Sequence, residues 1–207
     1  MKTPTLSTVT AAATLTTSAL AADAGSVSEL IAKIKSTDDQ VRGPAWQSAA
    51  SYGAPAVKPL AEVMATTDFE VARAAKRGLW KIVRHAGRQG ADAERQAVAK
   101  ELIDLLATTA APVSRELLWM LSEIGDDSAV EPIAAQLANA DVCEDARCAL
   151  ERIPGQAAVA ALRKALDTAP EKFKYALANS LRVCGEQVDG YPSQKLVPTK
   201  QTSVKAG

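Results

Sequence analysis

The histidine content of the chain limits the chemistry that its side chains could perform. His85 is the only histidine among 207 residues, so a catalytic triad would have to be built around this position, and a metal site with several histidines is excluded. The sequence contains no glycine-rich phosphate loop, nucleophile elbow or EF-hand pattern. Carboxylate pairs such as Asp38-Asp39 and Asp126-Asp127 fall at predicted helix starts, where acidic side chains favour the helix dipole. We therefore predict a protein that is not an enzyme and needs no cofactor or metal.

Three cysteines form no metal-binding or redox pattern. Cys143, Cys148 and Cys184 lack the two-residue spacing of a zinc knuckle or a redox pair. The first two are close on one predicted helix, where their side chains point about 140° apart, a poor placement for a disulfide. We expect all three to be buried as small hydrophobic groups. A bridge between Cys148 and Cys184, on neighbouring helices, stays an open alternative.

The strongest local charge lies between residues 76 and 95. Six basic side chains face only Asp92 and Glu94 there, a net charge of +4 in a chain whose 24 basic and 24 acidic residues cancel. The segment overlaps an insertion at about residues 84–95, and insertions in repeat proteins often project as loops on the binding face. It is either a solvated loop or a site for an anionic partner. In the second interpretation the binding residues are Lys81, Arg84, His85, Arg88 and Arg95.

Three tryptophans are the other candidate binding groups. Trp46, Trp80 and Trp119 fall on the first helices of successive predicted hairpins, but at different positions (phases) within the hairpin. Different phases fit packing between hairpins better than a shared aromatic groove, so we interpret them as core or half-buried anchors. Stacking of a ligand on their rings is the alternative. Because the chain as a whole is neutral, we predict no nucleic-acid partner.

A repeat of about 30 residues supplies the elements that position these groups. A step of this length, with one insertion of about 12 residues, aligns three kinds of position. We call each set of aligned positions a column. The valine column consists of Val41, Val71, Val113, Cys143 and Phe173, and the leucine column of Ala49, Leu79, Leu121 and Leu181, with Glu151 as its exception. The glycine column consists of Gly53, Gly125, Gly155 and Gly185, with Val83 as its exception.

The columns describe a helical hairpin. Apolar residues recur every three or four positions, which indicates amphipathic helices and not strands. Thr37 and Thr67, with Gln40 and Glu70 three residues later, form capping-box patterns that predict helix starts. The glycine column marks helix ends, and a second apolar helix follows it. Two helices this short are marginal alone, so we expect the hairpins to stack.

The segment from residue 39 to 60 resembles the HEAT-like repeats of the phycobilisome-lyase type. It contains an acidic turn, Val41-Arg42, an alanine-rich helix, the stop at Gly53 and the motif Ala56-Val57-x-x-Leu60. Residues 113–133 repeat the pattern with arginine one place later. The resemblance covers about residues 26–187 and implies an all-α fold, a right-handed α-solenoid of about five HEAT-like helical hairpins.

The same resemblance implies a function in binding. HEAT-like superhelices serve many binding tasks, so we expect a non-enzymatic protein-binding scaffold, monomeric, whose partner is another protein. A bilin-lyase-like chromophore-handling protein and an assembly factor for exported proteins are the alternatives. The resemblance favours a binding face on the second helices of the hairpins, where we expect exposed charged residues: Lys58, Glu62, Lys100, Asp104 and Lys164.

Both ends of the chain lie outside the repeat. Residues 1–22 fit a secretory signal peptide, because Lys2 precedes a short apolar stretch that ends in small residues around Ala21. We therefore expect export to the periplasm or the extracellular space, which disfavours the lyase alternative. Residues 188–207 are polar and lack an apolar period, as is typical of a flexible tail. No stretch reaches the roughly 18 consecutive apolar residues of a membrane-spanning helix.

Overall fold

The computed structural model describes residues 26–193. All regular secondary structure within this range is helical, as predicted. The α-helices of the described range are α1 (Val27–Ile34), α2 (Asp39–Gln47), α3 (Val57–Met64), α4 (Phe69–Ala86), α5 (Asp92–Leu106), α6 (Ala111–Ile124), α7 (Asp127–Ala135), α8 (Cys143–Arg152), α9 (Gln156–Thr168) and α10 (Glu171–Val183). Short 3-10 turns cover Ala49–Tyr52, Ala54–Ala56 and Gln136–Ala138.

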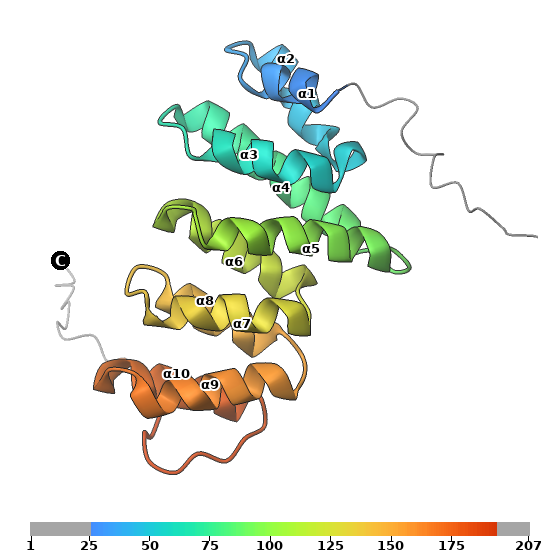
Figure 1. Cartoon of the computed structure of the whole chain (residues 1–207). Helices are drawn as coiled ribbons and strands as arrows, with labels where there is room; N and C mark the ends of the chain where they lie inside the picture. Colours follow the sequence, from blue (N-terminus) through green and yellow to red (C-terminus); the bar gives the residue numbers. More distant parts are fainter. Residues whose placement is uncertain (1–25, 194–207) are drawn as a thin grey trace, which may run out of the picture.

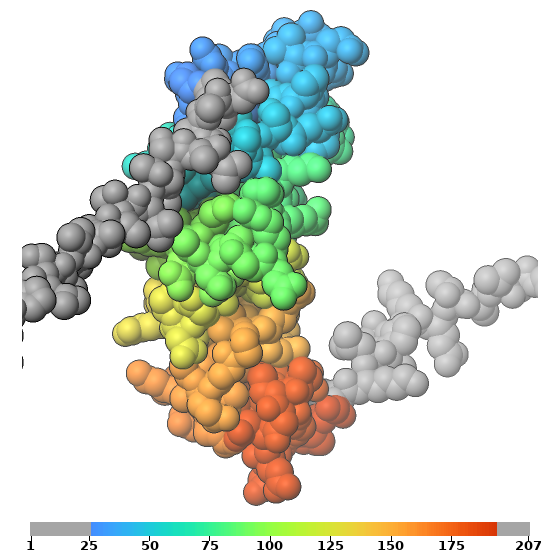
Figure 2. Space-filling model, turned by 90° about the vertical axis from the view of Figure 1, so that its right-hand side faces the viewer, coloured from blue at the N-terminus to red at the C-terminus, as the bar shows by residue number. Residues whose placement is uncertain are grey.

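The helices stack in two rows. Each even-numbered helix contacts the next even-numbered one, and each odd-numbered helix contacts the next odd-numbered one. Figure 1 shows the resulting layers, from α1 and α2 at one end to α9 and α10 at the other. From the side, the same layers follow one another along an elongated body (Figure 2). The fold is therefore an all-α solenoid, in which the stability of each layer depends on its neighbours.

The predicted hairpins are present in the predicted order. The pairs α2/α3, α4/α5, α6/α7 and α8/α9 each consist of a first helix followed by a second one. Helix α1 precedes these four hairpins, and α10 follows them as the first helix of the fifth predicted repeat. Counted from α1, the helices of the described range form five layers of two.

One hydrophobic core runs through the stack. Leu79, Leu121 and Leu181 of the predicted leucine column are each 0% exposed. Val41, the first member of the valine column, is instead 40% exposed. It lies on α2, which has no preceding even-numbered helix in the described range to cover it.

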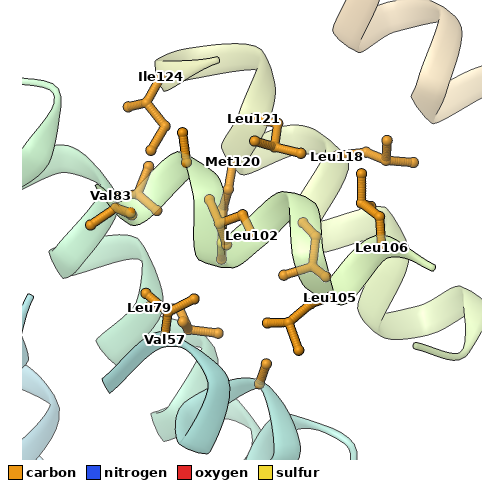
Figure 3. Close-up of a cluster of buried hydrophobic side chains, with 14 of the residues drawn as sticks. Val57, Leu79, Val83, Leu102, Leu105, Leu106, Leu118, Met120, Leu121 and Ile124 are labelled. Carbon is orange, nitrogen blue, oxygen red and sulfur yellow. The ribbon is translucent and has the colours of Figure 1, made fainter. Parts of the chain in front are cut away.

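Side chains from four helices meet at the middle of the core. Figure 3 shows Val57 from α3, Leu79 from α4, Leu102 from α5 and Leu121 from α6 as parts of one cluster of buried hydrophobic side chains. All four are 0% exposed. Burying an aliphatic side chain of this size contributes about 1.5–3 kcal/mol, so contacts between layers hold helices that would be marginal alone.

The insertion is helical and not a projecting loop. Helix α4 continues to Ala86, and α5 begins at Asp92, so only residues 87–91 connect them. The added residues therefore mainly lengthen two helices. Val83 breaks the glycine column because it lies inside α4, where no helix stop is needed.

Two helices begin one residue later than the threonine patterns predict. The N-cap of α2 is Asp38, whose Oδ1 accepts a hydrogen bond from the Gln40 amide at 2.8 Å. The N-cap of α4 is Asp68, whose Oδ1 accepts from the Glu70 amide at 3.0 Å. Aspartate and threonine both cap well, but the charged carboxylate also interacts favourably with the helix dipole.

The glycine column serves two purposes. Gly53, Gly155 and Gly185 have φ angles of 57°, 117° and 87°, which favour glycine as predicted. Gly125 differs, because its φ is −67°. A Cβ atom there would lie 2.5 Å from the carbonyl oxygen of Leu121, so Gly125 permits a close backbone approach.

The ends of the described range bear on the remaining predictions. The predicted signal peptide, residues 1–22, lies outside the described residues. The first residues of the predicted tail are held by the guanidinium of Arg182, which donates hydrogen bonds to the carbonyl oxygens of Val188, Gly190 and Tyr191 at 3.0, 2.7 and 2.9 Å. Between residues 26 and 193, no helix combines the length and apolar character needed to cross a bilayer.

Candidate functional site

A groove of about 740 Å³ lies across the even-numbered helices α2, α4 and α6. This volume is within the range of pockets that bind ligands. Eight of the twelve lining residues belong to α4. The lining consists of Trp46, Met64, Phe69, Ala72, Arg73, Lys76, Arg77, Trp80, Lys81, Arg84, Pro112 and Glu116.

The amphipathic pattern of α4 positions this lining. Ala75, Leu79 and Ile82 are buried against the core. Arg77 and Lys81, on the opposite side of the helix, are exposed. Because residues three and four apart share a helix face, the core contacts of α4 direct its basic side chains into the groove.

Cations lie over two tryptophan rings in the groove. The guanidinium carbon of Arg77 is 5.2 Å from the centre of the Trp46 ring, and the Lys81 Nζ is 5.9 Å from the same centre. The guanidinium carbon of Arg84 is 5.2 Å from the centre of the Trp80 ring. Such contacts are worth about 0.5–1 kcal/mol at exposed sites. They favour positions in which the long basic side chains stay along the groove.

The groove carries an excess of positive charge. Five of its lining residues are basic, and Glu116 is the only acidic one. Glu116 accepts from Lys76 Nζ at 2.5 Å and from Trp80 Nε1 at 3.3 Å. Arg73 pairs with Glu70. In the described part of the chain, the three remaining cations, Arg77, Lys81 and Arg84, have no carboxylate within 4 Å.

The predicted partner-binding residues separate into two groups. Lys81 and Arg84 line the groove. His85 lies instead in the last turn of α4 and Arg88 just after the helix, both near Glu94. Arg88 forms a bidentate pair with the Glu94 carboxylate, with nitrogen–oxygen distances of 2.8 and 2.6 Å. The hydrogen bond from Arg88 lowers the pKa of Glu94, so this pair is largely self-neutralised.

Arg95 has an internal structural role. Its guanidinium donates to the carbonyl oxygen of Ile124 at 3.2 Å and to Asp126 Oδ2 at 3.4 Å. These contacts tie α5 to the turn between α6 and α7. The predicted set therefore does not form one cluster, because its members are divided among α4, the connection at residues 87–91 and α5.

Sequence reasoning missed the shared aromatic groove. Trp46 and Trp80 sit at different phases of the repeat, yet the shift is about one helical turn, which keeps both on the same side of their helices. Both line the groove as half-buried residues. Trp119 lies outside it and donates from Nε1 to Asp145 Oδ1 at 2.9 Å. The signal that could have identified the groove was tryptophan and arginine at spacings of three and four residues.

The odd-numbered row presents a different surface. The five charged residues predicted there are exposed: Lys58, Glu62, Lys100, Asp104 and Lys164. Lys100 and Asp104 neutralise each other at 2.5 Å. A second hollow of about 680 Å³ lies mainly between α7 and α9 and is lined largely by alanine and other apolar side chains. This row therefore lacks the concentrated charge of the groove on α4.

The cysteines are half-buried thiols. Cys143, Cys148 and Cys184 are all free, so the structure contains no Cys148–Cys184 bridge. Burial raises the pKa of Cys148 and of Cys184. Since the thiolate is the reactive form, this direction of shift lowers the reactivity of the two thiols. Within residues 26–193, no three metal-ligating side chains gather in one place.

The two helical rows place this chain in the class of α-helical repeat solenoids. No family model matches the chain, and no curated protein matches it. Solved structures of similar chains include an engineered protein from a structural genomics consortium, with 23% identity, a TM-score of 0.40, and coverage of 78% of this chain and 80% of that one.

Designed repeat proteins are also among these similar chains. A designed armadillo repeat protein in complex with the peptide (KR)4 has 17% identity and a TM-score of 0.43, with coverage of 75% of this chain and 80% of that one. Computationally designed armadillo repeat proteins for modular peptide recognition give 18% identity and a TM-score of 0.44, with coverage of 74% and 80%. Similarities at this level assign no ligand to the present chain.

Proposed function

We propose that this chain is a non-enzymatic scaffold that binds another protein, and that the groove on α2, α4 and α6 is part of the contact surface. The observation that carries the proposal is the group formed by Arg77, Lys81 and Arg84, which lie over tryptophan rings without a carboxylate within 4 Å in the described residues. Cations without an internal carboxylate are available to acidic groups of another molecule, and such complementarity speeds association and selects partners.

The composition of the groove supports a protein partner. Aromatic residues and arginine are enriched where proteins bind one another, and they carry much of the binding energy. Phe69, at the start of α4, is 72% exposed in the same groove, with the Arg73 guanidinium over its ring. Extended surfaces made by successive repeats also suit protein ligands.

The groove supports binding more than catalysis. Its lining includes no histidine, cysteine, serine or threonine, so the usual nucleophiles and the usual general base are not gathered there. His85 lies near the surface carboxylate of Glu94, at 3.8 Å, on another part of α4.

Charge reversal with a matched control tests the proposed surface. The triple variant Arg77→Glu, Lys81→Glu and Arg84→Glu reverses the groove, and Lys58→Glu, Lys100→Glu and Lys164→Glu make the same net change on the odd-numbered row. Partners captured by the wild-type chain are identified by cross-linking and mass spectrometry, and helicity is checked by circular dichroism. We expect capture to be lost only in the groove variant.

The other outcomes of this experiment are informative. Loss of capture only in the odd-row variant would move the contact surface to the second helices of the hairpins. Capture that survives both changes would remove the charged groove from the proposal. Specific covalent modification of a captured partner by the wild-type chain would contradict a non-enzymatic role.

We also propose that the chain is exported. The basis is the sequence pattern of residues 1–22, with Lys2 before a short apolar stretch and small residues near Ala21. N-terminal sequencing of the mature chain tests this, and a start at Ala22 or Asp23 is expected. A mature chain that begins at Met1 would contradict export and would reopen the chromophore-handling alternative, which requires a cytoplasmic setting.

A further inference from the structure

We propose that the groove on α4 recognises a short extended segment of its partner in which acidic side chains alternate with large apolar ones. This inference rests on the proposed function and specifies the chemistry of the ligand. It follows from three features of the groove: the spacing of its cations, its exposed apolar surface and the covered faces of its tryptophans.

The cations are spaced to meet alternate residues of an extended chain. Arg77, Lys81 and Arg84 follow one another at steps of four and three residues, which separates them by about 6 Å and about 4.5 Å along the axis of α4. An extended peptide places every second side chain on the same side, at intervals of about 6.6 Å. Long basic side chains absorb the small difference in spacing. Acidic groups at alternate positions can therefore face successive cations.

The apolar part of the lining needs a different kind of side chain. Met64 and Pro112 line the groove together with Phe69, which is 72% exposed. Covering apolar surface is worth about 25 cal/mol per Å². In an extended segment, the residues between the acidic ones point to the opposite side. Phe69 lies eight residues before Arg77, about 12 Å along α4. An extended segment that runs along α4 past the cations therefore also reaches this apolar surface, which its large apolar side chains can cover.

The groove fits a polypeptide better than a nucleic acid. Proteins that bind single strands stack bases on free aromatic faces and contact a long run of phosphates. Here Arg77 and Lys81 cover a face of Trp46, and Arg84 covers a face of Trp80. Arg77, Lys81 and Arg84, which have no carboxylate partner in the described residues, span only about 10 Å along the axis of α4. This length matches a short acidic peptide segment.

A binding experiment with defined peptides tests the inference on the full chain. The probe is a fluorescently labelled nine-residue peptide in which glutamate alternates with leucine and phenylalanine. The comparison peptide has the same composition, with the glutamates in one block and the apolar residues in another. We expect the alternating peptide to bind at least tenfold more tightly, with an affinity that falls as salt is added.

Variants of the chain connect this binding to the groove. The reversal of Arg77, Lys81 and Arg84 to glutamate should lower the affinity for the alternating peptide at least tenfold. The reversal of Lys58, Lys100 and Lys164 should leave this affinity unchanged. Phe69→Ala should weaken binding at least threefold without changing its salt dependence. Because Phe69 is exposed at the first residue of α4, this change leaves the core intact.

Several results would overturn the inference. Equal affinity for the two peptides, or equal binding by the wild type and the groove variant, would show that the alternating pattern is not recognised there. Tighter, groove-dependent binding of a single-stranded oligonucleotide would assign the groove to nucleic acid. If neither peptide binds while partner capture still depends on the groove, the peptide inference fails and the scaffold function stands. If the peptide binds in the groove but partner capture does not depend on it, the proposed contact surface fails instead.

Discussion

Ser180 on α10 donates a hydrogen bond to Glu151 on α8, with 2.5 Å between Ser180 Oγ and Glu151 Oε2. Arg147, one turn before Glu151, donates from Nη1 to both, at 3.0 Å to the carboxylate and 2.5 Å to the hydroxyl. Ser180 is 0% exposed. A satisfied polar cluster therefore joins the last two even-numbered helices, at the position where glutamate interrupts the leucine column.

Replacing Glu151 with leucine should weaken this junction although it completes the leucine column. The change removes the acceptor of a buried hydroxyl and one carboxylate partner of Arg147, and an unsatisfied buried polar group costs about 1–3 kcal/mol. The effect should concentrate in α10, which has no following even-numbered helix in the described range. Amide hydrogen exchange should accelerate in α10 and remain unchanged in α4. Unchanged exchange in α10 would show that the cluster contributes nothing to the junction.

Glu151 also shows how far the repeat could be read from the sequence. The apolar spacing predicted the helices because amphipathicity is a local property, and Leu79, Leu121 and Leu181 are buried as predicted. The alignment of one repeat position cannot show that a glutamate there has acquired a partner on the next even-numbered helix. The same limit applies to Val41, whose exposure depends on its place at the end of a row.

The candidate site was predicted only in part, for a related reason. The charge of the segment from residue 76 to 95 identified Lys81 and Arg84, which line the groove. The orientation of the other basic side chains in this segment depends on whether the insertion forms a loop or lengthens two helices, and the sequence did not distinguish these. In the helical arrangement, Arg88 meets Glu94 and Arg95 meets Asp126. Trp46 joins the groove from α2 through contacts between layers, which spacing within one helix does not predict.

Gly125→Ala should destabilise the solenoid, whereas Gly43→Ala should not. A Cβ atom at Gly125 would lie 2.5 Å from the carbonyl oxygen of Leu121 and 3.2 Å from the Ile153 Cδ1. Relieving such a clash costs about 1–3 kcal/mol. Gly43 lies inside α2 with open space around it, and alanine there should stabilise the helix by about 0.5–1 kcal/mol. Thermal unfolding of the two variants measures the contrast, and equal midpoints would contradict it.

Asp126→Ala should destabilise the chain in a manner that depends on pH. Asp126 caps α7 by accepting at Oδ1 from the Ser128 hydroxyl at 2.6 Å and from the Ser128 amide at 3.0 Å. The hydrogen bond from the Ser128 hydroxyl is the main cause that lowers the pKa of Asp126 below its ordinary value of 3.8, with Arg95 contributing further. Loss of an N-cap costs about 1 kcal/mol at neutral pH.

The direction of this pH dependence follows from the lowered pKa. The ionised carboxylate favours the folded chain, so its contribution is complete above pH 3.8 and disappears as the pH falls through the lower value of the folded state. The stability difference between the wild type and Asp126→Ala should therefore shrink below about pH 4. Denaturant unfolding at pH 7 and pH 3 measures it. A difference that stays constant would mean that the charge of Asp126 is not involved.

Cys148 and Cys184 should react slowly with iodoacetamide in the folded chain. Burial is the main cause that raises the pKa of each thiol above its ordinary value of 9.0, and only the thiolate attacks the reagent. Mass spectrometry after alkylation at pH 7.5 should show both sites largely unmodified in the native chain and fully modified in urea.

The raised pKa of Cys148 also favours the folded state below pH 9, and this contribution to stability is lost as the pH rises through the pKa of the folded thiol. When the pH is raised from 8 to 11, the free energy of unfolding should therefore fall less in the Cys148→Ala variant than in the wild type. Rapid native alkylation of Cys148 would show instead that its half-buried thiol is not protected in the folded chain.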